Sequence, residues 1–117
     1  MITPEIKEMI ESNPLALATI NNNLTPHLIV VAFAKVTEGK IIITDNYMQT
    51  TIENLGHNNK VSLVVWNEEW KGYSIEGTAS YSKDGKWKEF ILSLEENKDE
   101  PCKGAIVIEV NKIIELG

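Results

Sequence analysis

The sequence predicts a mainly β protein, a small antiparallel barrel that carries about three short helices. Two observations support this class. Apolar segments of strand length follow one another with turn residues between them, and only three short stretches carry apolar residues at helical spacing. The chain has 117 residues, which suits one domain with one core. We therefore expect residues 1–117 to form a single domain with six strands.

A short helix is expected after Thr3, whose hydroxyl can cap it and which precedes Pro4. Its apolar side chains recur at helical spacing: Ile6, Met9 and Ile10. The segment Ser-Asn-Pro at 12–14 ends this helix. A first strand follows over residues 15–20, and the Asn triplet at 21–23 is interpreted as a plain hairpin turn.

A long second strand is expected over residues 28–36, LIVVAFAKV, where apolar residues run without clean alternation. Such a run indicates that both faces of the strand are covered, one by the barrel interior and one by an interface. Glu38 and Gly39 then form a hairpin turn into a third strand at 40–44. Residues 25–44 are therefore expected to form one antiparallel pair.

The rest of the chain is organised around the corner that follows the third strand. Turn residues at 44–46 break that strand, and a short helix follows in which Thr50 and Glu53 have the spacing of a capping box. Gly56 is expected to stop the helix. A helix that starts directly after a strand leaves free N–H groups and the positive end of its dipole exposed, and this arrangement is a natural site for a phosphate.

Three further strands and one helix are expected in the second half of the chain. Strands are predicted at 61–66 and 72–81, and Gly77 in the second of them indicates a bend or a close approach of the backbone. The helix between 72–81 and the last strand has an apolar stripe interpreted as core packing: Trp87, Phe90, Ile91 and Leu94. The last buried strand is expected at 105–110, and residues 111–116 either continue it or form a short tail.

The composition excludes several classes of function. The net charge of −6 and a pI near 4.9 argue against nucleic acid as the main partner. No apolar run approaches the ~20 residues needed to cross a bilayer, and the acidic first helix is unlike a secretory signal, so no membrane association is expected. The single cysteine, Cys102, leaves no internal disulfide and suits a reducing cytoplasm. His27 and His57 lack metal-ligand spacing, so no metal site is expected.

No set of catalytic side chains is evident. Cys102 lies in a charged loop without a base beside it and is interpreted as an incidental thiol. His27, at the start of a strand, is interpreted as a hydrogen-bonded structural residue rather than an acid or base. Trp66 and Trp70 flank a loop that could reach a partner subunit or a bound ring, and simple burial in a subunit interface is equally open.

The order of these segments resembles the pyridoxamine 5′-phosphate oxidase-like split-barrel family, in particular its small FMN-binding members. The matching segments are LATI at 17–20, Pro26-His27 at the start of the second strand, ITD at 43–45 with the helix TTIENL at 50–55, NNKVSL at 58–63, and GY at 72–73 with EGTA at 76–79. Their order and spacing carry the resemblance, which covers residues 15–110.

The resemblance implies a six-stranded antiparallel Greek-key split barrel that forms a homodimer, with FMN in two equivalent clefts between the subunits. The phosphate would lie at the corner before the second helix, and the flavin ring would lie along the second strand. The implied cofactor-binding residues are Val30, Val31, Ala32, Thr44, Asn46, Tyr47, Gln49, Thr50 and Thr51. No catalytic residue is implied, because the flavin ring itself carries the hydride or electrons.

One position departs from the family pattern. Family members commonly carry Lys or Arg in the turn before this helix, whereas Gln49 and Thr50 are neutral here and the chain has no Arg. A charged donor makes a hydrogen bond roughly twice as strong as a neutral one. Lys35, Lys71 and Lys103 are the candidates for supplying the missing charge.

The implied function is that of a cytoplasmic FMN-binding flavoprotein that transfers electrons or reduces a small molecule. Its partner would then be a small molecule or a redox protein. Two alternatives stay open: a non-catalytic module that binds flavin, deazaflavin or haem, and a dimer whose cleft has degenerated and binds nothing. The sequence therefore does not decide whether the protein is an enzyme.

Overall fold

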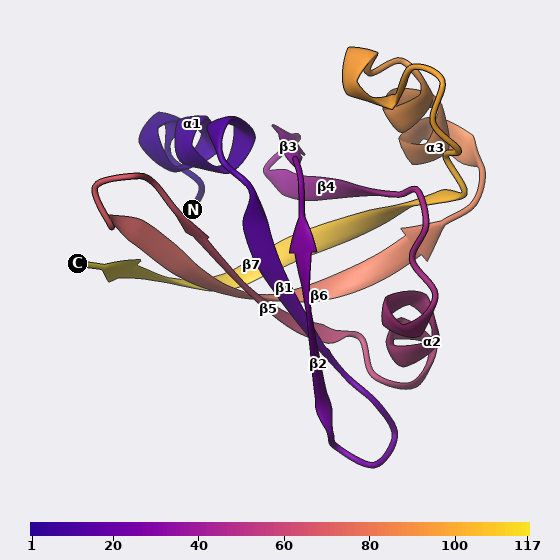
Figure 1. The fold of residues 1–117 in the computed structure, drawn as a ribbon, viewed down its shortest axis with the longest axis horizontal. Coiled ribbons are helices and arrows are strands. Elements are labelled where there is room, and N and C mark those ends of the chain that lie inside the picture. Colours follow the sequence, from indigo (N-terminus) through magenta and orange to yellow (C-terminus); the bar gives the residue numbers. More distant parts are fainter.

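The computed structural model describes residues 1–117 as seven strands and three α-helices (Figure 1). The strands are β1 (Leu15–Ile20), β2 (Pro26–Val31), β3 (Lys35–Thr37), β4 (Lys40–Asp45), β5 (Lys60–Trp66), β6 (Gly72–Ser82) and β7 (Gly104–Leu116). The helices are α1 (Pro4–Ser12), α2 (Thr50–His57) and α3 (Gly85–Leu92), and a 3₁₀ helix, η1, spans Glu95–Asn97. The mainly β class predicted from the sequence is confirmed.

All seven strands belong to one antiparallel sheet, in the order β2-β1-β5-β6-β7-β4-β3. The two edge strands, β2 and β3, follow one another in the chain, and only residues 32–34 join them. Because so short a connection has to reach both edges, the sheet curls into a barrel with a seam between β2 and β3 (Figure 1).

The predicted count of six strands is wrong, because the apolar run at 28–36 is not one strand. β2 pairs with β1, whereas β3 pairs with β4, so the chain changes partners at residues 32–34. Ala34, at the end of this bend, is 0% exposed, and its small side chain lets the backbone pass close to the core. An antiparallel pair was expected over residues 25–44, and only its second half is found, as the pairing of β3 with β4. The predicted turn at Glu38 and Gly39 joins these two strands, and φ is positive at both residues.

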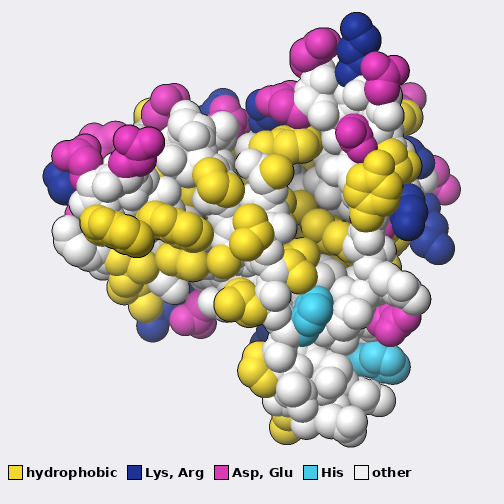
Figure 2. Space-filling model, in the orientation of Figure 1, with side chains coloured by type: hydrophobic (Ala, Val, Ile, Leu, Met, Phe, Trp, Pro, Cys, Tyr) yellow, Lys and Arg dark blue, Asp and Glu magenta, His cyan; other side chains and the backbone are white.

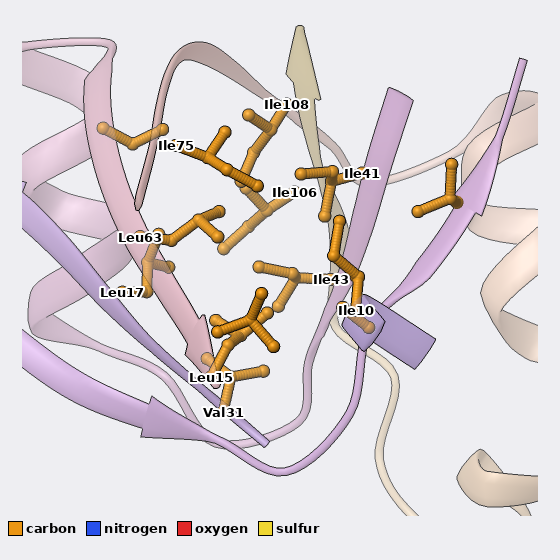
Figure 3. Packing of buried hydrophobic residues seen from close by; sticks show 14 of the residues in the cluster. Ile10, Leu15, Leu17, Val31, Ile41, Ile43, Leu63, Ile75, Ile106 and Ile108 are labelled. Carbon is orange, nitrogen blue, oxygen red and sulfur yellow. The ribbon is translucent and has the colours of Figure 1, made fainter. Parts of the chain in front are cut away.

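Alternating side chains of the strands fill the barrel (Figure 3). Buried aliphatic residues converge there from five strands: Leu15, Leu17, Ile41, Ile43, Leu63, Ile75, Ile106 and Ile108. α1 closes one end of the barrel with Ile6 and Ile10, as its apolar stripe predicts. The predicted cap of this helix is also present, since the amide of Ile6 donates to the Thr3 hydroxyl at 3.3 Å.

A second, smaller core lies under α3, outside the barrel. Ile42 projects from the opposite face of β4 to its neighbours in the sequence and packs with Ile91, Ala105 and Val107. The stripe predicted on this helix packs here too, with the Trp87 and Phe90 rings in an edge-to-face contact at 6.4 Å between centroids. Core packing is therefore confirmed as the role of the stripe.

β6 and β7 pair over almost their whole length, and residues 111–116 continue the last strand rather than form a tail. Their register shifts between Glu76 and Gly77. A Cβ on Gly77 would lie 2.6 Å from Ile108 Cγ2 and 2.7 Å from the carbonyl oxygen of Glu109. Gly77 thus marks a close backbone approach at a bulge, as predicted.

The close approach at Gly77 predicts that Gly77→Ala lowers the free energy of unfolding by about 2 kcal/mol, because the added methyl overpacks the strand against β7. Urea denaturation followed by circular dichroism measures the change. Gly56→Ala is the matched control, since a Cβ there meets nothing within 4 Å and alanine favours a helix. Equal stabilities of the two variants would contradict the close approach.

Candidate functional site

A buried carboxylate fixes the corner between β4 and α2. Asp45 is 2% exposed, and its Oδ1 accepts a hydrogen bond from the amide of Met48 at 2.8 Å. Its Oδ2 accepts a 2.5 Å hydrogen bond from the hydroxyl of Tyr81, which comes from β6. Burial raises the pKa of Tyr81 well above its usual range, and the hydrogen bond to Asp45 and the charge of that carboxylate raise the pKa further. The corner is thereby tied to a neighbouring strand.

The first turn of α2 leaves backbone donors free at this corner. The first amide of the helix with an acceptor is that of Glu53, which donates to the Gln49 carbonyl at 3.0 Å, and the amides of residues 50–52 have no backbone acceptor. The predicted capping box is wrong, because Thr50 is already the first helical residue and Gln49 occupies the N-cap position without a side-chain cap. The three free amides and the positive end of the helix point to an anion.

The predicted stop at Gly56 is also wrong. Gly56 lies inside α2, and its φ is not positive. The helix ends at His57, where the backbone N–H of Asn58 donates to the Asn54 carbonyl at 2.8 Å. The side chain of Asn54 holds the helix against the barrel, since its Nδ2 donates to the buried hydroxyl of Thr19 on β1 at 3.0 Å.

The segment after α3 braces the corner from the other side. Asn97 is 5% exposed, and its Nδ2 donates to the Thr44 hydroxyl and to the Ile91 carbonyl, each at 2.8 Å. Asn46 donates in turn to Asn97 Oδ1 at 3.3 Å and to the carbonyl of Pro101 at 2.7 Å. Asn97 was not predicted from the sequence, because Thr44 and Asn46, its partners at the corner, lie 53 and 51 residues away in the chain and no local pattern surrounds it.

Tyr47 stands at the rim of the same corner and is 72% exposed. Its hydroxyl donates to Glu100 Oε2 at 2.8 Å. That hydrogen bond raises the pKa of Tyr47, and desolvation and the negative charge of Glu100 raise this pKa further. Glu100 was likewise not predicted from the sequence.

A cavity of about 390 Å³ lies between β2 and this corner, within the range of small-molecule sites. It has 13 lining residues, 7 of them hydrophobic. One wall is the strand and its continuation, with His27 and residues 29–33, and the other is polar, with Thr44 and residues 46–51. Figure 2 shows hydrophobic side chains gathered across the middle of the molecule in this view, with acidic and basic side chains mostly at the rim. The cavity suits an elongated ligand with one flat apolar end and one anionic end.

The structure brings all nine sequence-predicted site residues to this one cavity: Val30, Val31, Ala32, Thr44, Asn46, Tyr47, Gln49, Thr50 and Thr51. The remaining lining residues were not predicted: His27, Ile29, Phe33 and Met48. His27 lies on the same face of β2 as Ile29 and the predicted Val31, because side chains at every second residue of a strand project to one face, and this spacing was the signal that could have found it.

No lysine lines the cavity. Lys35 forms an ion pair with Glu96, and its hydrogen bond to that carboxylate lowers the pKa of Glu96 below the usual range. Lys71 lines a separate hollow beside α1 and β7. Lys103 meets the corner through its backbone, where its N–H donates to the Asp45 carbonyl at 2.9 Å. None of the three lysines considered from the sequence therefore stands at the cavity.

β2 leaves apolar surface exposed beside the cavity. It is an edge strand, and its outward side chains Leu28 and Val30 are 68% and 75% exposed. The interface cover expected for this strand is thus not provided within one copy of the chain. No group of three or more His, Cys, Asp or Glu side chains is arranged for a metal ion, and no helix has the length and apolar character of a membrane span.

A curled antiparallel sheet with a seam defines the class of split-barrel proteins, and a ligand-sized cavity lies beside that seam here. More narrowly, the chain belongs to the pyridoxamine 5′-phosphate oxidase family, whose model matches residues 2–117. The sequence-based assignment to this family is confirmed.

Three individual proteins illustrate what the chain is similar to. The uncharacterized protein MJ0282 of Methanocaldococcus jannaschii is 29% identical over 120 residues, an alignment that covers 98% of this chain and 80% of that protein. The structure of HupZ from Group A Streptococcus superposes with a TM-score of 0.86 at 23% identity, over 99% of this chain and 94% of that one. An FMN-binding protein from Syntrophomonas wolfei subsp. wolfei superposes with a TM-score of 0.74 at 19% identity, over 97% of this chain and 87% of that one. At these identities the two structures show a shared fold.

The hydrogen bond between Tyr81 and the buried Asp45 predicts that Tyr81→Phe lowers the free energy of unfolding by roughly 2 kcal/mol at neutral pH, because Asp45 loses a hydrogen bond. Since the folded-state pKa of Tyr81 is raised, its contribution is present below the ordinary tyrosine pKa and is lost as the pH rises above that value. Urea denaturation of both proteins from neutral to alkaline pH measures this. A stability difference that does not change with alkaline pH would contradict the coupling.

Proposed function

We propose that the cavity binds FMN and that the protein uses it to transfer electrons or to reduce a small molecule. The observation that carries the proposal is the two-sided character of the cavity, an apolar strand wall facing a helix N-terminus with three free amides. FMN has the matching shape, a flat aromatic ring joined to an anionic phosphate. We therefore assign both ends of the cavity to one ligand.

The strand wall suits the flavin ring. Val30, Val31 and Ala32 line the cavity, and β2 has a strand partner on one side only. The N–H and C=O groups on its outer edge are therefore available to the carbonyl oxygens and ring nitrogens of an isoalloxazine. The aliphatic side chains along this wall exclude water from the ring.

The corner suits the phosphate through neutral donors. The Thr50 and Thr51 side chains line the cavity beside the free amides, and Asp45, Tyr81 and Asn97 hold this backbone in place. Backbone N–H groups at a helix N-terminus bind phosphates without a basic side chain. The donor set thus fits the group despite the neutral Gln49-Thr50 pair.

When bound, FMN supplies the hydride or electron transfer, and the chain supplies binding and orientation. The cavity walls would hold the ring against β2 and leave one side for a substrate or a redox protein. This division of labour accounts for the lack of an evident catalytic set among the side chains. A cytoplasmic location is part of the proposal, because the single Cys102 suits a reducing compartment.

The active form is proposed to be a homodimer with one cleft for each copy. The supporting observation is the uncovered apolar edge at Leu28 and Val30, which borders the cavity. An exposed apolar edge strand favours association with another chain. A second copy of this chain would cover the edge and close the mouth of the cavity.

A second candidate is a non-catalytic module that holds a deazaflavin or haem. It is favoured by the absence of a lysine from the cavity and by the presence of an imidazole there. The same fold occurs, with a TM-score of 0.74 in each case, in an F420 reductase and in HutZ, the haem storage protein of Vibrio cholerae. Steady turnover of a reductant and an acceptor by the FMN-loaded protein would exclude this candidate.

The test of the proposal is the visible absorbance spectrum of the purified protein, followed by titration with FMN. We expect flavin bands in the spectrum, or quenching of FMN fluorescence on titration. Thr51→Val should weaken FMN binding by about tenfold, the scale of one hydrogen bond to a charged group, because it removes a hydroxyl from the cavity with little change in shape.

Thr25→Val, in the exposed β1–β2 loop, is the matched control and should bind FMN as the unaltered protein does. If the protein shows no flavin bands and does not quench FMN fluorescence at excess FMN, the FMN assignment is overturned. Titrations with deazaflavin and with haem would then decide whether the second candidate holds or the cleft is degenerate.

The dimer predicts that Leu28→Lys raises the dissociation constant between copies by on the order of tenfold or more, because a charge replaces apolar surface in the interface. Analytical ultracentrifugation over a range of concentrations measures this. Leu92→Lys is the control, since Leu92 is 59% exposed on α3, away from the cavity. If the unaltered protein remains monomeric at high concentration, the proposed dimer is contradicted.

A further inference from the structure

One side chain of the cavity can carry a positive charge, and it is that of His27. Its partner across the β1–β2 ladder is Thr19, and cross-strand partners project to the same face of a sheet. Ile29 and Val31 share this face of β2 and also line the cavity. His27 itself is among the residues that line the cavity, so the imidazole lies at the cavity wall.

α2 docks on this same face. The hydroxyl of Thr19 accepts the 3.0 Å hydrogen bond from Asn54, and both side chains are buried. Thr50 and Thr51 precede Asn54 by four and three residues, so they lie on the same side of the helix, one turn closer to its N-terminus. The Thr19–Asn54 contact thus sets the distance between the strand that carries His27 and the free amides of the helix.

The other charges near the cavity do not compensate for an anion. Asp45 and Glu100 are carboxylates held at the corner through Tyr81 and Tyr47, and no lysine lines the cavity. An anionic end of a ligand at α2 would therefore depend on neutral donors unless the imidazole contributes.

We infer that His27 is a specificity-determining residue, which donates a hydrogen bond from its imidazole to the anionic end of the ligand and makes the cavity select the phosphorylated flavin over the unphosphorylated one. This inference rests on the proposed flavin function. It assigns to the strand wall the role that the turn before α2 lacks in this chain.

The test is a binding cycle between His27 and the phosphate. FMN and riboflavin share the same ring and differ in the phosphate, so the ratio of their dissociation constants isolates its recognition. Fluorescence quenching gives both constants for the unaltered protein and for His27→Gln, His27→Lys and His57→Gln. We expect His27→Gln to weaken FMN binding by about tenfold and to leave riboflavin binding unchanged.

His27→Lys should retain the preference for FMN, because it places a cationic donor at the same position of the strand. His57→Gln is the matched control, since His57 is exposed at the end of α2 and does not line the cavity. If His27→Gln weakens both flavins equally, or neither, the inference is overturned while the flavin function stands. The same holds if the unaltered protein binds FMN and riboflavin equally. If it binds neither, the proposed function and this inference both fall.

Discussion

The site depends on one buried carboxylate, that of Asp45. Its two oxygens accept from the Met48 amide and the Tyr81 hydroxyl, and its carbonyl accepts from the amide of Lys103. Three segments that are distant in the sequence therefore meet at one residue. Because removing a partner from a buried charge is strongly destabilising, these contacts restrict the corner to one arrangement. That restriction keeps the first turn of α2 open toward the cavity.

β4, which leads into this corner, lies between two hydrophobic cores. Ile41 and Ile43 face the barrel, whereas Ile42 faces α3, so both faces of the strand are buried. Thr44 continues the face of Ile42, and its hydroxyl is taken by Asn97. The polar residues of the corner therefore begin where the strand leaves the two cores. Because Asn97 is hydrogen-bonded both to Ile91 of α3 and to Thr44, a movement of α3 would shift the cavity wall.

Features encoded locally could be predicted from the sequence, and features that depend on distant partners could not. The cap at Thr3, the hairpin at Glu38-Gly39 and the close approach at Gly77 each follow from a few adjacent residues. The break after β2 was missed, because an apolar run does not show that its two halves pair with opposite edges of the sheet. Thr50 was placed one position early in its helix, because Gln49 occupies the N-cap position without a side-chain cap and no capping pattern in the sequence marks it.

The sheet order also has a consequence for how the chain is synthesised. β4 emerges early from the ribosome, but its long-range partner is β7, with Lys40 opposite Glu109. Until β7 is made, Ile41 and Ile43 lack Ile106 and Ile108 as neighbours, and one edge of β4 stays open. Pairings between distant segments are slow to form and leave apolar surface exposed in the meantime. The nascent protein thus carries an unfinished barrel edge, with the apolar side chains of β4 uncovered, until the last strand is made.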